Sequence, residues 1–436
     1  MEKLYQYLWK HRMFGREMSV DGLRVRILSP GVLNNGAGPD FQAARLLVGD
    51  TVWAGNIEIH VKASDWFRHH HDTDPAYDNV ILHVVAIDDM KVRRRDGSLI
   101  PQILVTFPEK FFHIYSSLAD NINSVRCASY LKTLPDLAVT DWVETLTVER
   151  MQTKAMRIIE TARQAGGDWE QACFITLARA LGFGINSVPF EMTARSLPLK
   201  YIRRHGDNLL QIEALLFGQA GMLDTSIHIF DEYYQLLCRE YFFLARKYGL
   251  RPLRNDIWKY ARTRPQNFPH RRIAVLARAL YRDFSIIGDL LAFRGDEEAL
   301  RDLFRWKLEG YWLTHSDFDV ETHGVAETLG AASLDLLLIN FASPFIYAYS
   351  GEHGNPEKAE RSFDIWHGLA PERNMFMRQW EAAGIKCRDA GQSQALLHLR
   401  REYCDKNRCL ECRWGCFMLR DTVTPHSRML GKVNSL

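Results

Sequence analysis

The chain has 436 residues, a formal net charge of +2 at pH 7, and 47% hydrophobic and 25% charged residues. These values are typical of a soluble globular protein with two or three domains. No run of about eighteen uncharged apolar residues occurs, which argues against a membrane span, and the first residues lack the basic and then apolar layout of a signal peptide. We therefore expect a cytoplasmic protein, and its eight scattered cysteines do not indicate a disulfide framework.

One helix followed by strands is predicted for the first quarter of the chain. Apolar residues recur every four positions over residues 2–14, which indicates a helix. The strand-like segments are Leu23–Leu28, Phe41–Val48, Val52–Val61 and Asn79–Ile87, followed by Lys91–Arg95 and Ile100–Phe107, which flank the hairpin signal Asp96-Gly97. Residues 1–110 are therefore predicted to form an α+β domain.

Helical periodicity dominates the rest of the chain. Apolar residues at spacings of three and four predict helices over Leu137–Gln164, Trp169–Leu181, Leu209–Phe217, Ile227–Arg246, Ile273–Phe284, Glu297–Tyr311 and Leu334–Tyr349. We expect a larger all-helical domain over residues 111–400 and a cysteine-rich, metal-binding segment over residues 401–436.

The most informative stretch is a hairpin that carries one carboxylate on each arm. Gly49-Asp50-Thr51 is turn chemistry, and a turn centred there places Asp40 opposite position 59 within about one residue. Asp40 and Glu58 are then neighbours, because directly opposed strand residues lie roughly 4.5–5.5 Å apart. Side chains alternate along a strand, so Glu58, His60 and Lys62 share one face.

Two facing carboxylates suit a divalent cation. Mg²⁺ or Mn²⁺ takes oxygen ligands and keeps several waters, one of which can become a nucleophile. Asp40 and Glu58 are candidate ligands, and His60 or Lys62 can orient the water or offset charge that develops on a phosphate. The same pattern also fits an ordinary, exposed, charged strand face.

Pro39-Asp40, a hairpin, and then Glu58-x-His60 resemble the PD-(D/E)XK superfamily of restriction-type endonucleases. The resemblance implies a helix and a mixed sheet around the hairpin, metal ligands at Asp40 and Glu58 with the Ile59 carbonyl as a candidate third, and a nucleic-acid substrate. The chain departs from the pattern at the lysine position, which is His60, and Lys62 is the candidate substitute. The alternative is a catalytically inactive protein of this fold that binds nucleic acid or acts as a scaffold.

Nearly the whole chain also resembles a bacterial family that is catalogued as a domain of unknown function. The residues that carry this resemblance are Gly38-Pro39-Asp40-Phe41, Glu58-Ile59-His60, Ser64-Asp65-Trp66, Asp74 with Tyr77, Val80-Ile81-Leu82-His83-Val84-Val85, Glu213-Ala214-Leu215-Leu216-Phe217-Gly218-Gln219-Ala220-Gly221, Arg264-Pro265, Asn267-Phe268-Pro269, Tyr403-Cys404, Cys409-Leu410 and Cys412. The resemblance implies membership and supplies no activity.

Three histidines and two aspartates lie close together just after the second arm of the hairpin, in His69-His70-His71-Asp72-Thr73-Asp74. His69, His71 and Asp74 are candidates for a second metal or a proton-transfer group in the pocket of Glu58. The alternatives are a plain polar loop, or a zinc hydrolase in which these histidines converge on one point. His83 is predicted to be a core histidine.

Half of the cysteines lie in the pattern Cys404-x4-Cys409-x2-Cys412-x3-Cys416. Four thiols at such short spacings are typical of a structural zinc site or an iron–sulfur cluster. Buried free thiols are the alternative. The fourth ligand stays open, because Cys127 resembles the distant cysteine with which some PD-(D/E)XK nucleases complete a four-iron cluster.

Residues 251–272 form the most basic segment. Its cations, which include Arg262, Arg264, Arg271 and Arg272, alternate with aromatic residues. Such a pattern is typical of a surface that binds phosphates and stacks on bases, and it also fits a solvated helix face. The choice between DNA and RNA and the oligomeric state stay open.

Overall fold

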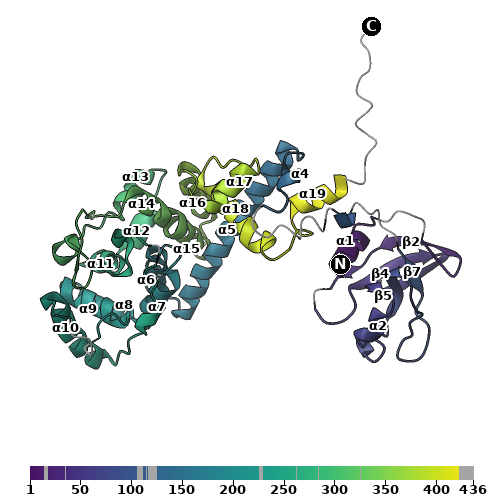
Figure 1. Ribbon diagram of the computed structural model, residues 1–436, viewed down its shortest axis with the longest axis horizontal. Helices are drawn as coiled ribbons and strands as arrows, with labels where there is room; N and C mark the ends of the chain where they lie inside the picture. Colours follow the sequence, from purple (N-terminus) through teal and green to yellow (C-terminus); the bar gives the residue numbers. More distant parts are fainter. Residues whose placement is uncertain are drawn as a thin grey trace, which may run out of the picture. The chain divides into compact units, whose positions relative to one another are not determined.

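The computed structural model describes residues 1–13, 18–34, 36–105, 111–113, 115, 125–224, 229–261, 263–282, 284–324 and 326–421. The chain divides into two compact units, and most of their helices and several strands are labelled in Figure 1. Unit 1 comprises Met1–Trp142, Ala382–Gly384 and Arg400–Leu436, and unit 2 comprises Val143–Glu381 and Ile385–Leu399.

Unit 1 contains a mixed sheet of seven strands in the order β1-β2-β4-β5-β6-β7, with β3 paired to β4. The strands are Met18–Val20 (β1), Leu23–Ser29 (β2), Val32–Leu33 (β3), Phe41–Val48 (β4), Thr51–Lys62 (β5), Val80–Ile87 (β6) and Gln102–Leu104 (β7). Strand β5 pairs antiparallel with β4 and parallel with β6, so the sheet changes direction at β5. The α+β class and the mixed sheet are confirmed.

Apolar side chains cover both faces of this sheet. Ile57 and Ile59 of β5 pack with Tyr5 and Trp9 of helix α1 (Glu2–Lys10) in one cluster. Trp66, from helix α2 (Asp65–Arg68), belongs to a smaller cluster on the other face. The strict alternation of β5 therefore leaves its even-numbered residues on the face of α2.

The expected strands at the hairpin agree with the structure closely, and the segment after residue 90 differs. Asp96-Gly97 does form a turn, with a single bridge between Arg93 and Leu99. The next strand, however, pairs in parallel with β6 instead of with residues 91–95. Ile103 explains the difference, because this pairing buries it in the core beneath β6.

Unit 2 is built almost entirely of helices around one large apolar core. The helices are Asp136–Gln164 (α5, which begins in unit 1), Trp169–Leu181 (α6), Ser187–Ser196 (α7), Leu199–Arg203 (α8), Leu209–Gln219 (α9), Glu232–Tyr248 (α10), Pro269–Leu280 (α11), Ile286–Leu291 (α12), Glu297–Asp302 (α13), Ala331–Leu337 (α14), Ser343–Glu352 (α15), Pro356–Gly368 (α16), Met375–Ala382 (α17) and Ala390–His398 (α18). His315–Asp317 (β8) and Val320–Glu321 (β9) add a small sheet that the sequence did not predict. Unit 1 also contains Ala128–Leu131 (α4) and Arg413–Asp421 (α19).

Two expected helices in unit 2 have different bounds. The helix expected over Glu297–Tyr311 ends at Asp302, because the backbone of Leu308 bonds to the Glu327 carbonyl instead of continuing a helical ladder. The helix expected from residue 227 begins at Glu232, where the Asp231 side chain accepts a hydrogen bond from Tyr234 N as its cap.

Among the described residues, one helical stretch has the length and apolarity of a membrane span. It runs over Ala331–Glu352 and includes a π-helical turn at Leu338–Ala342. In its most apolar window, 61% of the residues are buried inside the protein. This is the burial expected of a central core helix.

Glu213, on α9, gives the stability of unit 2 a pH dependence. Tyr233 donates its hydroxyl hydrogen to Glu213 Oε2 at 2.5 Å, and burial raises the pKa of Glu213 from 4.5 to about 7. Protonated Glu213 stabilises the folded state fully below pH 4.5, and this stabilisation is lost as the pH rises through 7. The reason is that the Glu213 carboxyl loses its proton at a lower pH in the unfolded chain than in the folded one. Glu213→Gln should therefore reduce the fall in melting temperature between pH 5 and pH 8.

The matched control is Glu232→Gln, which changes an exposed carboxylate one position before Tyr233. We expect it to keep the wild-type dependence of melting temperature on pH. The same dependence in Glu213→Gln as in the wild type would contradict the assignment.

Candidate metal centres

Asp40 and Glu58 lie side by side where β4 and β5 begin to pair. Phe41 is opposite Ile57, so the register is one residue from the expected one, with a bulge between Phe41 and Ala44. The backbone N–H of Asp40 donates to Glu58 Oε2 at 3.0 Å, and the backbone N–H of Ile59 donates to Asp40 Oδ2 at 3.1 Å. Each carboxylate is therefore held by the backbone of the other strand.

Helix α1 adds two polar side chains that the sequence analysis did not single out. Gln6 Nε2 donates to Asp40 Oδ1 at 2.8 Å. Ligand atoms of Glu2, Glu58 and His60 all lie within 4.8 Å of one another. The only local signal is a glutamate one turn before a polar glutamine, which is common on solvated helices, so the packing of α1 on the sheet was needed to find Glu2.

His60, which is buried, joins a network of imidazoles that extends to the exposed His69. Its Nδ1 lies 2.9 Å from His83 Nε2, and its Nε2 lies 3.1 Å from His69 Nδ1. One ring nitrogen each of His60, His69 and His71 lies within 4.8 Å of the other two. His71 Nε2 is also 3.3 Å from Glu58 Oε1. These histidines converge on one point, and the exposed His70 is not part of the group.

The remaining residues that were expected at the site have other positions or roles. Asp74 caps the short helical turn Pro75–Tyr77 by accepting a hydrogen bond from Ala76 N at 2.9 Å. Lys62 is exposed at the end of β5. His83 is fully buried, as expected of a core histidine, and it also contacts His60.

Burial controls the charge state of this centre. Burial and the nearby Glu58 charge together raise the pKa of Asp40 to about 7, and burial raises the pKa of Glu58 to about 8. Burial also lowers the pKa of His60 to about 2, so this imidazole is neutral. His60 therefore cannot supply the positive charge of the lysine that the PD-(D/E)XK pattern has at this position.

The donor atoms fit a divalent cation. Two carboxylates and up to three imidazoles face one another, and His60 belongs both to the group with Glu2 and Glu58 and to the group with His69 and His71. Mg²⁺ prefers oxygen donors alone, whereas imidazole donors suit first-row transition metals. The mixed set favours Mn²⁺ over Mg²⁺, and zinc also fits the histidine group.

A second candidate centre contains the cysteines. Cys127, Cys404 and Cys412 are buried and Cys409 is partly buried, and all eight cysteines of the chain are free. Burial raises the pKa of each of these four thiols, and neighbouring thiols raise the pKa of Cys127 and Cys404 further, which places the four close together. Cys416 donates its thiol hydrogen to the Leu410 carbonyl at 3.0 Å, and its sulfur is near enough to raise the pKa of Cys409.

Groups around Cys412 suit a bound thiolate. The backbone N–H groups of Trp414 and Gly415, at the start of α19, lower the pKa of the Cys412 thiol against the larger effect of burial. The buried indole Nε1 of Trp142 has no hydrogen bond of ordinary geometry among the described atoms, yet it too lowers that pKa. These donors point to a negative sulfur.

A bound zinc ion would fix the distances between the four sulfurs. A tetrahedral zinc site with Zn–S bonds of about 2.3 Å brings its sulfurs to roughly 3.8 Å from one another. Among the described residues, the groups of three or more ligand atoms within 4.8 Å include no cysteine. The choice between zinc and an iron–sulfur cluster, in which each thiolate binds a different iron, therefore stays a prediction.

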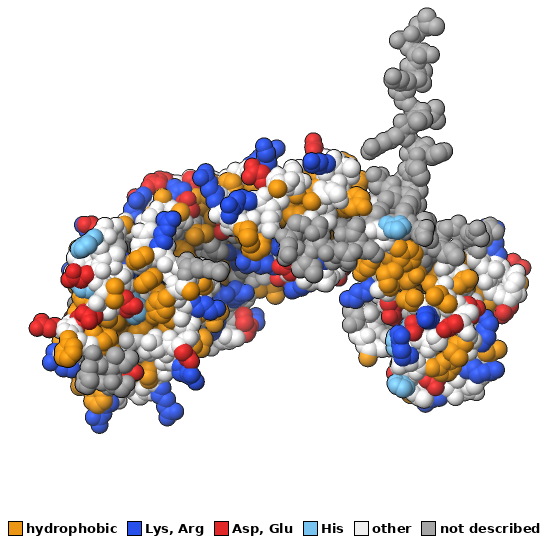
Figure 2. Space-filling model, in the orientation of Figure 1, with side chains coloured by type: hydrophobic (Ala, Val, Ile, Leu, Met, Phe, Trp, Pro, Cys, Tyr) orange, Lys and Arg blue, Asp and Glu red, His pale blue; other side chains and the backbone are white. Residues whose placement is uncertain are grey.

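The basic segment is not a continuous surface. Arg264 is exposed, Arg271 and Arg272 are buried, and Arg262 lies outside the described residues. On the face of the molecule shown in Figure 2, Lys and Arg side chains are interspersed with Asp and Glu. The role of these arginines in nucleic-acid binding therefore stays a prediction.

A family model described as "Protein of unknown function (DUF2851)" matches residues 2–375. The chain belongs to this family. The matched range includes the sheet, Glu2 and the converging histidines, and it ends before Cys404. No curated protein and no solved structure matches the chain. The expected membership of a family of unknown function is thereby confirmed.

Glu58→Gln should separate metal binding from folding. The change removes a carboxyl group whose ionisation is costly beside Asp40 and Glu2, so in chelator above pH 8 the variant should melt at or a few degrees above the wild-type temperature. Excess Mn²⁺ should raise the melting temperature of the wild type and leave that of the variant unchanged. Differential scanning calorimetry measures both effects.

The exposed His70 provides the control, because His70→Ala lies in the same loop as the converging histidines. It should respond to Mn²⁺ as the wild type does. A full response in Glu58→Gln would rule out Glu58 as a ligand.

Proposed function

We propose that the chain is a metal-dependent phosphodiesterase that cleaves nucleic acid. The observation that carries the proposal is the convergence of Glu2, Glu58 and His60, with Asp40 alongside, at a buried point on β5. Buried carboxylates without a cationic side-chain partner are costly, and a divalent cation removes that cost. The resemblance of Pro39-Asp40 and Glu58-x-His60 to PD-(D/E)XK nucleases supports nucleic acid as the substrate.

A bound metal at this centre would supply a Lewis acid and a water of lowered pKa. Glu58 and Glu2 would hold it through oxygen, and His60 through a neutral ring nitrogen. Gln6 and the Ile59 N–H orient Asp40, which leaves its carboxylate pre-positioned beside Glu58. His71 Nε2, 3.3 Å from Glu58 Oε1, is placed to accept a proton from the attacking water.

A second candidate function is that of a zinc hydrolase that does not act on nucleic acid. The convergence of His60, His69 and His71 favours it, because three imidazoles with an open position are typical of catalytic zinc. The two candidates share the centre and differ in metal and substrate. A third alternative, an inactive binding or scaffolding protein, would bind nucleic acid without cleaving it.

Asp40→Asn and His69→Ala test the nuclease proposal. Purified full-length protein is incubated with single-stranded and double-stranded DNA and RNA, with Mn²⁺, Mg²⁺ or Zn²⁺ in parallel. We expect cleavage by the wild type with Mn²⁺ and a loss of at least a hundredfold in Asp40→Asn, with a smaller loss in His69→Ala. His70→Ala should remain active.

Each other outcome of this assay has a meaning. Equal cleavage by the wild type and Asp40→Asn would indicate a contaminating nuclease. Binding without cleavage under every metal would favour the inactive alternative. Hydrolysis of a small ester with Zn²⁺, without cleavage of nucleic acid, would favour the zinc hydrolase.

We also propose an iron–sulfur cluster held by Cys127, Cys404, Cys409 and Cys412, with a structural role. The proposal rests on the burial of these thiols, on the neighbouring thiols that raise the pKa of Cys127 and Cys404, and on the hydrogen bond that Cys416 donates to the Leu410 carbonyl. Anaerobically purified wild type should contain iron and absorb broadly in the visible range. Cys127→Ser should lose both signals, whereas Cys416→Ser should keep them.

Elemental analysis decides between the metals at this second centre. One zinc per chain with no iron would favour a zinc site, and neither metal would contradict both forms of the proposal. Free cysteines fit a reducing compartment, so we propose a cytoplasmic location.

A further inference from the structure

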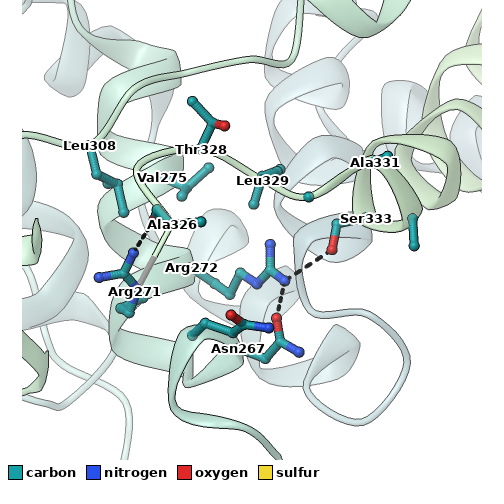
Figure 3. Close-up of a pocket in the computed structure, with 13 residues that line it drawn as sticks. Asn267, Arg271, Arg272, Val275, Leu308, Ala326, Thr328, Leu329, Ala331 and Ser333 are labelled. Atoms are coloured by element: carbon teal, nitrogen blue, oxygen red, sulfur yellow. Dashed lines mark hydrogen bonds between the residues drawn. The ribbon is translucent and has the colours of Figure 1, made fainter. Parts of the chain in front are cut away.

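Unit 2 contains a cavity of about 360 Å³ that no part of the proposed function uses. It is lined by one side of α11, by residues 326–330, and by the first residues of α14 (Figure 3). Val275, Leu308 and Leu329 form apolar walls, and Arg271 and Arg272 are its only charged residues. None of the thirteen residues that line it is acidic.

Arg272 is the central residue of this cavity. Its side chain is buried, with 5% of the residue exposed, and its guanidinium lies over the Phe183 ring at 4.3 Å. Nη2 donates to Asn267 Oδ1 and to Ser333 Oγ. Among the described residues, Nε and Nη1 have no hydrogen-bond partner, and Figure 3 shows Nη1 pointing toward the part of the cavity beside Leu329.

Arg271 does not neutralise the charge of Arg272. Its terminal nitrogens donate to the backbone carbonyls of Trp312, His315 and Ala326, so it ties the loop that closes the cavity to α11. It adds a second buried positive charge, which together with the larger effect of burial lowers the pKa of Arg272 to about 10. Two adjacent buried cations thus have no carboxylate beside them among the residues that line the cavity.

An unpaired buried charge is among the most costly features that a core can contain. Proteins normally neutralise a buried arginine with a carboxylate or a phosphate, which matches its fork of N–H donors. The pairing of Arg272 with only an amide and a hydroxyl leaves that requirement unmet. Of the two unpaired nitrogens, Nη1 points toward a cavity that is large enough for an oxyanion with an attached body (Figure 3).

We infer that this cavity binds a small organic oxyanion, a phosphate ester or a carboxylate, with its charged head on Arg272 and its body against Val275, Leu308 and Leu329. Asn267 and Ser333 hold the guanidinium in position for the head group. A polynucleotide chain cannot reach so deeply buried a cation except through a terminal phosphate. The inference is independent of the metal centre, which lies in unit 1.

Arg272→Met and Ser333→Asp test this inference in the full-length protein. The first removes the charge and keeps an apolar side chain against Phe183. The second retains Arg272 and places a carboxylate beside its Nη2, where it would act as a built-in anion. Arg278→Gln is the matched control, because Arg278 lies on the same helix, pairs with Glu309, and does not line the cavity.

The probes are inorganic phosphate, phenyl phosphate and benzoate, with sodium chloride at matched ionic strength as the reference. Isothermal titration calorimetry measures affinity, and scanning calorimetry measures the shift of the melting temperature. We expect the wild type and Arg278→Gln to bind at least one aromatic probe at least tenfold more tightly than both cavity variants do. A preference for phenyl phosphate would assign a phosphate ester, and a preference for benzoate would assign a carboxylate.

The stability of the ligand-free variants provides an independent readout. Ser333→Asp should melt above the wild type without any probe, because it neutralises Arg272, and it should lose the response to all three probes. Equal responses of the wild type and Ser333→Asp to the probes would overturn the inference. Stabilisation by sodium chloride to the same extent as by phosphate would overturn it as well, and so would binding of a single-stranded oligonucleotide without binding of any small probe.

Discussion

Strand β5 is the element on which the candidate chemistry depends, because it is the strand at which the sheet changes from antiparallel to parallel pairing. The antiparallel partner β4 brings Asp40 to Glu58, and the parallel partner β6 brings His83 to His60. The two sets of backbone hydrogen bonds hold β5 in one register. A slip by one residue would turn Glu58 and His60 into the apolar cluster of Ile57 and Ile59.

Both units contain buried groups of one sign without a side chain of the opposite sign to neutralise them. In unit 1, burial raises the pKa of both Asp40 and Glu58, the Glu58 charge adds to this effect at Asp40, and the His60 imidazole beside them is neutral. In unit 2, Arg271 and Arg272 lie together in a cavity without an acidic residue. Stability alone does not favour either arrangement, and the proposed ligands, a cation in unit 1 and an oxyanion in unit 2, would each supply the missing charge.

Much of unit 1 follows from short-range patterns. Turn residues at Gly49-Asp50 and the alternation of β5 suffice to place Asp40 next to Glu58 and to put His60 on the same face, because strand geometry has a period of two. Lys62 shares that face and yet is exposed, since the strand ends there. The period of two indicates which face of the strand a side chain is on. It does not indicate how far along the strand the buried core extends.

The sequence by itself determined the α+β and helical parts, the hairpin with its two carboxylates, and the cysteine-rich segment, because each depends on neighbours within about twenty residues. Only the tertiary structure decided which distant groups join them. Glu2 reaches the site because α1 packs on the sheet, and Cys127 lies near the C-terminal cysteines through long-range packing. Arg272 shows the same limit, since a basic segment reads as surface until the burial of each side chain is known.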